Sequence, residues 1–592
     1  MRNSKKFTIV AVLLLVAVLT TTLCGCNLFF RLDESDMLEY MNELTVSMFT
    51  GDGISINILL EDPEALGLKD EPSSLPLPNF DKDNYEKGMA QLSQVATLFG
   101  YVDYNNLSLI GKCDRDTVID FFTTYSEYRD FYYLSNRDYI GANDGWNVIL
   151  PLYLDKLAFK TENDVKNWIS LLEQTEDAFK QYAKFEKEVL IPAGYARSTS
   201  TYNEIATQCE GMTVDTEDGE HFLYGIFENK IDKVLFLTEE GKETYKASAK
   251  SAITVMKGAY QTLAEEMKNC AKTAPATEKP LASYKEGKKY YELLFKDNSS
   301  SSDSVETAYN NLCDAFNDAL AEAQSLQSQL PDDFSLQQNM TMEALQGYYS
   351  TIKLRYTEDF PALNANTPDA TFHEVPDAMA DFYNPASYFK SAIDSLSAPE
   401  TIYVNEVNAS GYLGFDIISH EGIPGHMLQH AYYKSTGANK LRSLMGYTGY
   451  AEGWATYAQY YSAKYFEGTD TEKLAYQVEC LYDKATIYLY TIVDIEINYF
   501  GKTLEQLKQE PAYKNLAVES VYNYMVQNPA VYSSYGYGYY KMSALRDKYQ
   551  GSDLEFHTAV LSVGPTTYEI LEKHVLGKVE EKGNGTIWDI FF

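Results

Sequence analysis

The chain of 592 residues carries 49 Lys and Arg against 85 Asp and Glu, which gives a formal net charge of −36 at pH 7. So acidic a surface repels nucleic acid and anionic lipid, and a polynucleotide partner is therefore disfavoured. The share of hydrophobic residues, 45%, is typical of a globular protein, and the length exceeds the usual size of a single core. We therefore expect two helical lobes around a deep cleft.

The first residues predict an export signal. A basic start, Arg2 to Lys6, precedes an apolar run over residues 7–19 that is too short for a membrane span. The run closes with Leu-Cys-Gly-Cys, which resembles a bacterial lipobox with Cys26 as the lipidated residue and Cys24 as the alternative acceptor. A plain signal peptide with incidental cysteines is the other interpretation.

This interpretation divides the chain into two parts. Residues 1–25 are expected to be a lipoprotein signal peptide, and residues 26–592 a helical domain, in one or two lobes. The mature protein is then extracytoplasmic and attached to the bacterial cell membrane by a lipid anchor at Cys26.

Amphipathic helical patterns dominate the rest of the chain. One apolar stripe at helical spacing runs from Val165 to Tyr182 and stops before Pro192, and another helix is predicted over residues 305–330. The serine-rich run at residues 297–303 predicts an exposed flexible loop. The clearest strand covers residues 401–404. The predicted fold is mainly α, with a small β element beside the active site.

His420, Glu421 and His426 lie in one short segment, Ser-His-Glu-Gly-Ile-Pro-Gly-His, and Glu452 follows in Ala-Glu-Gly-Trp-Ala. Two imidazoles and a carboxylate, with a further carboxylate beside them, are what a catalytic zinc site requires. His430 is an alternative ligand. We favour the interpretation that it is packed in the core or lies behind the ligands.

The spacing of the two histidines raises a geometric problem. In the common His-Glu-x-x-His helix the histidines lie about 40° apart around the axis, whereas six positions place them about 240° apart. Pro424 and Gly425 stand where a break of the helix is required, because proline removes a backbone donor and glycine accepts unusual dihedral angles. A bulge at residues 422–425 would return His426 to the face of His420.

The two glutamates are expected to have different roles. Glu421 can accept a proton from zinc-bound water and deliver it to the leaving amine. Glu452 begins a predicted helix over residues 452–466, and a turn between antiparallel helices would bring it back to the metal as the third ligand. Without the histidine motif nearby, Glu452 would be interpreted as a solvated acid at a helix end.

A segment rich in tyrosine and glycine follows at residues 535–540, and its pattern predicts a loop leading into a helix over residues 541–549. A phenol on such a loop can donate a hydrogen bond to the oxyanion of a tetrahedral intermediate. Aromatic packing is an equal alternative for any single tyrosine.

At these residues the chain resembles the bacterial domain-of-unknown-function family 885, whose members carry a His-Glu-x-x-Pro-Gly-His block followed by Glu-Gly-Trp-Ala. The resemblance runs from about Gly194 to the C-terminus. That family is similar to helical gluzincin peptidases such as thimet oligopeptidase and the thermostable carboxypeptidases. The resemblance includes the following further positions: Val404, Asn405, Asp494, Gly501, Gly538, Leu545, Arg546 and Phe556.

The resemblance implies His420, His426 and Glu452 as zinc ligands, Glu421 as base and Tyr535 as oxyanion donor. For substrate binding we expect Asn405 and Arg546, together with Tyr403, whose strand would pair with an extended substrate backbone. The chain departs from the family pattern at three places, which leave the ligands intact and concern substrate binding: Asn498, Tyr524 and Val531.

The sequence therefore predicts a zinc metallopeptidase that hydrolyses short peptides outside the cytoplasm, with water activated by Glu421 as nucleophile. The main alternative is a catalytically inactive lipoprotein that binds zinc or peptides, although such a protein has no need of a base. Hydrolysis of a non-peptide amide or ester would use the same site.

Overall fold

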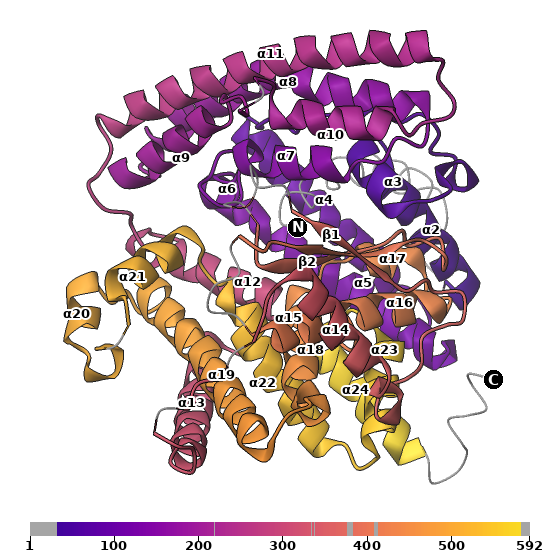
Figure 1. Ribbon diagram of the computed structural model, residues 1–592, viewed down its shortest axis with the longest axis vertical. Coiled ribbons are helices and arrows are strands. Elements are labelled where there is room, and N and C mark those ends of the chain that lie inside the picture. The colour runs from indigo at the N-terminus through magenta and orange to yellow at the C-terminus, as the bar shows by residue number, and fades with distance from the viewer. Residues whose placement is uncertain are drawn as a thin grey trace. The chain divides into compact units, whose positions relative to one another are not determined.

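Over the residues that it describes, the computed structural model is mainly helical with one small sheet, as the sequence predicts (Figure 1). None of the described helices is long and apolar enough to cross a membrane. The predicted export signal and Cys26 lie outside the described residues. The structure describes residues 32–217, 219–332, 334–336, 338–375, 380, 383–407, 413–514 and 516–581.

The chain forms two compact units. The first comprises Met1–Val102 and Phe122–Lys279, and the second comprises Asp103–Phe121 and Pro280–Phe592. Helix α5 (Leu109–Glu127) has residues in both. All the site residues predicted from the sequence, apart from Cys26, belong to the second unit.

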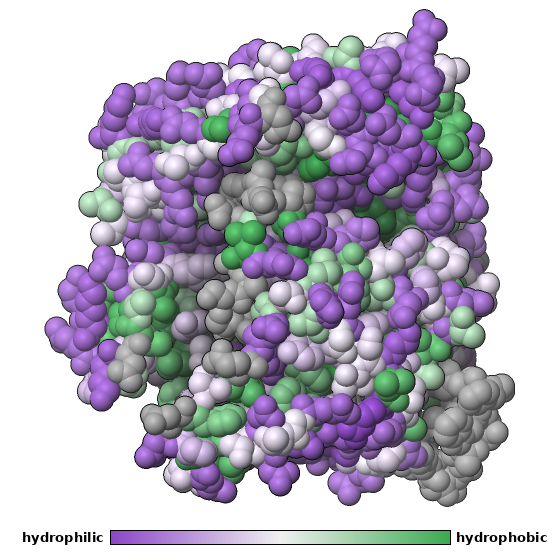
Figure 2. All heavy atoms as spheres, in the orientation of Figure 1, coloured by the Kyte–Doolittle hydropathy of each residue, from purple (hydrophilic) through white to green (hydrophobic). Residues whose placement is uncertain are grey.

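The first unit is built on two long helices, α8 (Glu162–Phe185) and α11 (Glu239–Ala271), which pack along each other (Figure 1). The predicted stripe on α8 is buried, since Val165 and Trp168 have no exposed surface and Tyr182 has 1%. The surface over α11 that faces the viewer, at the top of Figure 2, is mostly hydrophilic. The other helices of this unit are α2 (Glu34–Phe49), α3 (Gly53–Leu59), α4 (Lys82–Gly100), α6 (Tyr132–Ser135), α7 (Trp146–Lys156), α9 (Thr199–Gly211) and α10 (Phe222–Ile231).

The second unit contains the sheet, in the order β1-β3-β2. Strand β3 (Glu400–Val404) confirms the predicted strand; it pairs in parallel with β1 (Ala370–Glu374) and antiparallel with β2 (Ala386–Phe389). The prediction that substrate would pair beside Tyr403 is wrong, because both sides of β3 are already hydrogen-bonded. The edge strands are β1 and β2.

Helices make up the rest of the second unit, and α18 packs along α22 as α13 packs along α19. The predicted helix over residues 305–330 is confirmed as α13. The helices are α12 (Gly287–Ser299), α13 (Val305–Gln327), α14 (Met342–Lys353), α15 (Gly414–Glu421), α16 (His426–Ser435), α17 (Lys440–Leu444), α18 (Thr448–Tyr461), α19 (Asp470–Asn498), α20 (Leu504–Gln509), α21 (Val518–Gln527), α22 (Tyr532–Lys548), α23 (Asp553–Val563) and α24 (Tyr568–Glu581).

The tyrosine–glycine segment is not a loop: it forms the first turns of α22. Its glycines allow two neighbouring helices, α19 and α18, to pack closely against α22. A Cβ on Gly536 would lie 2.3 Å from Thr491 Oγ1 of α19, and one on Gly538 would lie 2.6 Å from the Gly449 carbonyl oxygen of α18. The predicted loop is therefore wrong, because these glycines admit two neighbouring helices rather than loosen the backbone.

The serine run at residues 297–303 is also not an exposed loop. Ser299 and Ser301 have no exposed surface, and the Ser300 carbonyl oxygen accepts a hydrogen bond of 2.8 Å from the backbone N–H of Tyr568. A Cβ on Gly449 would lie 2.1 Å from the Ser299 backbone. Small residues here let the segment pass directly beneath α18.

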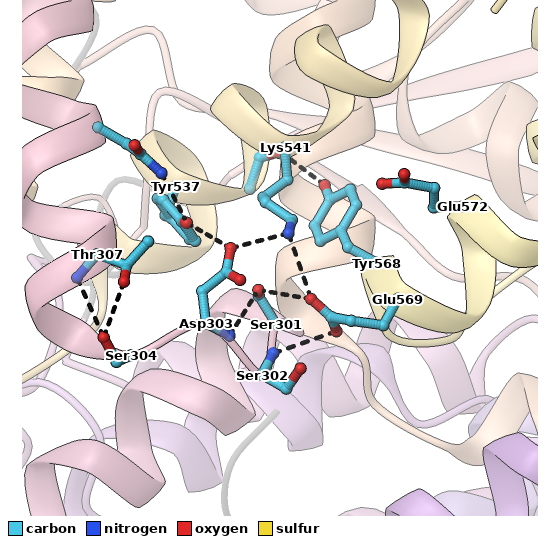
Figure 3. A network of polar contacts seen from close by, with 12 residues as sticks. Ser301, Ser302, Asp303, Ser304, Thr307, Tyr537, Lys541, Tyr568, Glu569 and Glu572 are labelled. Atoms are coloured by element: carbon cyan, nitrogen blue, oxygen red, sulfur yellow. Dashed lines mark hydrogen bonds and ion pairs between the residues drawn. The ribbon is translucent and has the colours of Figure 1, made fainter. Parts of the chain in front are cut away.

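An ion-pair network holds the same segment against α22 and α24 (Figure 3). Lys541 Nζ lies 2.9 Å from Asp303 Oδ2 and 3.3 Å from Glu569 Oε1, and the Tyr537 hydroxyl donates to Asp303 at 2.6 Å. Ser301 Oγ donates to Glu569 at 3.0 Å. The network fixes the helix that carries Tyr535.

Candidate functional site

The two histidines of the motif lie on two different helices. Helix α15 ends at Glu421 and α16 begins at His426, so the helix breaks at residues 422–425 as the sequence predicts. A Cβ on Gly425 would lie 1.9 Å from the His420 carbonyl oxygen, so the chain turns back closely on α15 at a position that requires glycine.

The second motif supports this break. Trp454 is fully buried on α18, and its indole N–H donates to the Pro424 carbonyl oxygen at 3.0 Å. Gly453, beside it, allows α18 to meet α22, because a Cβ there would lie 2.5 Å from the Gly538 backbone. Glu452 is consequently carried to the two histidines.

His420, His426 and Glu452 converge as the sequence predicts. Their candidate ligand atoms all lie within 4.8 Å of one another. Glu452 Oε2 lies 3.4 Å from His420 Nε2 and 3.3 Å from His426 Nε2, and the three side chains are 13–17% exposed. The cluster is thus mostly buried yet reachable from solvent.

The Glu452 carboxylate and the two imidazoles stabilise one another's charged forms. Burial acts to raise the pKa of Glu452, but His426 and His420 outweigh it and hold this pKa well below its ordinary value. Burial likewise acts to lower the pKa of His426, but Glu452 and Glu421 raise it to about 9. The carboxylates therefore create a strongly cation-attracting environment.

The donor set fits a divalent metal ion such as zinc. Tetrahedral zinc sites with bonds of about 2.0–2.2 Å place their ligand atoms about 3.4 Å apart, close to the two measured separations. Among the described residues, no hydrogen bond of normal geometry reaches the buried Glu452 Oε2. This oxygen faces the two imidazoles, and a buried carboxylate is costly unless protonated imidazoles or a metal cation neutralise it.

Glu421 occupies the position expected of a base. It is half-buried, and one of its carboxylate oxygens accepts a hydrogen bond of 2.6 Å from the backbone N–H of Tyr388 on the edge strand β2. It is close enough to His426 and Tyr535 to raise the pKa of both side chains. The backbone of β2 thus orients the Glu421 carboxylate through one of its two oxygens.

Tyr535 reaches the same site from α22. Its ring stacks on that of His420, with centroids 6.3 Å apart and planes 19° apart. The Glu452 carboxylate, followed by burial, holds the pKa of its phenol well above the ordinary value. The hydroxyl therefore stays protonated and can donate a hydrogen bond.

Gln459 supports His420, and Asp483 and Tyr460 lie behind it; none of the three was found from the sequence. His420 Nδ1 lies 3.1 Å from Gln459 Oε1, and Gln459 Nε2 donates to Asp483 at 3.2 Å. The Tyr460 hydroxyl also donates to Asp483, at 2.8 Å. This arrangement places the proton on Nδ1 and turns Nε2 toward Glu452. Gln459 follows Glu452 by seven positions, about 20° around the same helix face, which is the signal that could have found it.

We call the three candidate ligands, His420, His426 and Glu452, the ligand cluster. The other predicted residues lie outside it. His430 is buried, with Nε2 3.1 Å from the Ser391 carbonyl oxygen, which agrees with a packed core histidine. Asn405 is 1% exposed and donates to the carbonyl oxygens of Ala380 and Tyr383. Arg546 pairs with Asp553. A role of Asn405, Tyr403 and Arg546 in substrate binding stays a prediction.

Comparison with known proteins places the chain by fold and family. A crystal structure of a candidate lipoprotein from Colwellia psychrerythraea is similar with a TM-score of 0.79 and 17% identity, covering 93% of this chain and 100% of that one. A candidate lipoprotein of unknown function from Shewanella oneidensis gives a TM-score of 0.58 and 15% identity, covering 85% and 94%. No curated protein matches. The model of the family described as bacterial protein of unknown function, DUF885, matches residues 63–575, and the chain therefore belongs to this family.

Proposed function

We propose that this protein is a zinc-dependent peptidase of the gluzincin type that hydrolyses short peptides outside the cytoplasm. The observation that carries the proposal is the convergence of His420, His426 and Glu452 on one point, with Glu421 beside them. A site that only held a metal would have no use for a further carboxylate, Glu421, beside the three candidate ligands.

Each side chain has a distinct role in the proposed reaction. His420, His426 and Glu452 would hold zinc, which when bound supplies a Lewis acid for the scissile carbonyl and makes water easier to deprotonate. Glu421 takes the proton from the attacking water and passes it to the leaving amine. Tyr535 donates its phenolic proton toward the developing oxyanion. The Tyr388 N–H keeps Glu421 in position.

The proposed location is the outer side of the cell membrane, with a lipid anchor at Cys26. The apolar leader and the Leu-Cys-Gly-Cys sequence support it. The two structures of similar fold are also described as candidate lipoproteins.

Glu421→Gln tests the proposal, because it removes the base and keeps the shape of the side chain. Zinc content, measured by elemental mass spectrometry, is expected to stay near one per chain. Cleavage of a mixed peptide library is expected to fall by about 10²–10⁴-fold. A chelator should abolish wild-type cleavage, and added zinc should restore it. Glu467→Gln, at an exposed acid of the same unit, is the matched control.

Three outcomes would each contradict a different part of the proposal. A zinc-loaded wild-type protein that cleaves no peptide contradicts the peptidase, and an ester and amide panel then reports a different hydrolase. Wild-type protein that binds no zinc contradicts the metal site itself. Equal cleavage by Glu421→Gln and wild type removes Glu421 from the reaction.

A further inference from the structure

Three cationic side chains lie around the ring of Tyr104 in the second unit. The charged groups of Lys112 and Arg115, both on α5, lie 5.6 and 5.4 Å from the ring centroid, and that of Lys573 on α24 lies 4.8 Å from it. Lys573 also donates a hydrogen bond to the Tyr104 hydroxyl. We call Tyr104, Lys112, Arg115 and Lys573 the cation cluster.

The two lysines of the cation cluster present their charge to solvent. The Lys573 side chain is 54% exposed, and Lys112 is partly exposed. Asp116 lies 2.8 Å from Lys573 and 3.2 Å from Arg115. Among the residues that the structure describes, no carboxylate forms an ion pair with Lys112. The carboxylate within the cluster therefore leaves the charge of Lys112 unmatched.

Two acids next to the cation cluster in the sequence are paired with other cations. Asp114 lies 2.7 Å from Arg442, and Glu572 lies 3.0 Å from Lys548. Because these carboxylates are already compensated, the cluster keeps a local positive charge on a chain whose net charge is −36.

The cation cluster begins close to the point where the chain from the predicted lipid anchor joins the fold. The Leu32 N–H donates to the Tyr101 carbonyl oxygen at 3.4 Å, and Leu32 pairs with Val102. Tyr104 follows Val102 by two residues. The six residues from Cys26 to Leu32 can span at most roughly 20 Å. A lipid on Cys26 would thus hold Leu32 and Val102 within about that distance of the bilayer.

An acidic protein held so close to a membrane requires a compatible face. Its net charge repels a leaflet that contains anionic lipids. Salt screens this repulsion beyond about 8 Å at physiological ionic strength, so the groups nearest the leaflet dominate. Lysines close to an anionic leaflet are attracted to it, and tyrosine rings are enriched at the level of the headgroups. The cation cluster contains both kinds of residue.

We propose that the cation cluster is a membrane-contact surface that binds the phosphate groups of anionic phospholipids. The inference rests on the proposed lipid anchor at Cys26 and is independent of the metal centre. Lys112 and Lys573 donate hydrogen bonds to phosphate oxygens, and the Tyr104 ring lies at the headgroup level between them. The anchor keeps the protein at the membrane, and the cluster determines which face turns toward the bilayer.

Amine footprinting of the acylated protein tests the contact directly. The protein on vesicles of phosphatidylcholine and phosphatidylglycerol is labelled sparsely with a water-soluble succinimidyl ester, and each lysine is read by mass spectrometry. Lys573 is expected to react about tenfold more slowly there than in the unacylated Cys26→Ser chain in solution. Lys473, which is exposed on α19 of the same unit, is the internal control and should react equally in both.

Lipid composition and salt sharpen this measurement. Protection of Lys573 should weaken on vesicles of phosphatidylcholine alone and at high salt, because both remove the electrostatic attraction. Equal protection on the two kinds of vesicle overturns the recognition of anionic lipid. Equal reactivity of Lys573 in the acylated and the unacylated protein overturns the contact itself.

Vesicle flotation separates this inference from the anchor. The Cys26→Ser chain is floated with phosphatidylglycerol vesicles at low salt, and Lys112→Gln combined with Lys573→Gln should lower its vesicle affinity about tenfold. Lys473→Gln combined with Lys514→Gln, which changes the net charge equally at two other exposed positions of the unit, is the matched control and should not.

The mass of the N-terminal peptide reports whether Cys26 carries a lipid. If it carries none while the lysine-dependent flotation persists, the anchor fails and the cation cluster stands. If Cys26 is acylated and the two lysines are neither protected nor required for flotation, the cluster fails and the anchor stands. An unacylated chain that does not float contradicts both.

Discussion

The ligand cluster and the tyrosine helix α22 meet at one site, yet their sequences encode it differently. In the ligand cluster the break between α15 and α16 follows from Pro424 and Gly425, whose backbone constraints act locally. In α22 the glycines suggest a loop, but they lie inside a helix because neighbouring helices pack against them. Glycine marks a turn in one region and a helix contact in the other.

The comparison predicts that the two regions can be separated by mutation. Changes in the ligand cluster should alter metal binding. Changes in α22 should alter turnover or stability and leave the metal in place.

Tyr535→Phe is expected to have the largest effect of these changes. It removes the phenolic proton and keeps the ring on His420, so cleavage should fall about 10²–10³-fold while zinc content stays unchanged. The measurements are kcat/KM on a peptide that the wild type cleaves and zinc by elemental mass spectrometry. Tyr540→Phe on the same helix is the control. Loss of zinc from Tyr535→Phe would show that the two regions are not separable.

Gly538→Ala tests the packing role of the glycines in α22. Alanine is normally the better helix residue, but its Cβ would lie 2.6 Å from the Gly449 carbonyl oxygen. We expect the free energy of unfolding to fall by about 2–3 kcal/mol, measured by urea denaturation.

The control for this change is Gly347→Ala, on the exposed face of α14, where an added Cβ meets nothing within 4 Å. It should stabilise the protein by up to about 1 kcal/mol. Equal stabilisation by both substitutions would contradict the packing role of Gly538, because Gly538 would then behave as an unhindered helix position.

Gln459→Ala should weaken the metal site without touching a ligand. The substitution frees the His420 ring, and zinc affinity is expected to fall about 10–100-fold in a competition titration with a chelating dye. Tyr460→Phe, which leaves the contact between His420 and Gln459 intact, should cause a smaller loss. Unchanged zinc affinity in Gln459→Ala would mean that the orientation of His420 does not depend on this hydrogen bond.

Much of the fold was predictable where one segment contains its own evidence. The stripe on α8, the helix α13 and the strand β3 follow from periodicity and residue type. Predictions failed where a segment distant in the sequence determines the local structure. The serines at residues 299–301 are buried because Gly449 packs against them. The backbone of Tyr403 is unavailable for pairing with substrate because β1 and β2 flank β3.

The sequence by itself determined the break between α15 and α16 and the approach of the two histidines, because His420, Pro424, Gly425 and His426 act within one short stretch of backbone. The tertiary structure alone decided how closely Glu452 approaches the histidines, that Gln459 orients His420, and that the Tyr535 ring stacks on His420. These features depend on how closely α18, α19 and α22 approach one another, and the distance between helices is set by packing of residues far apart in the chain.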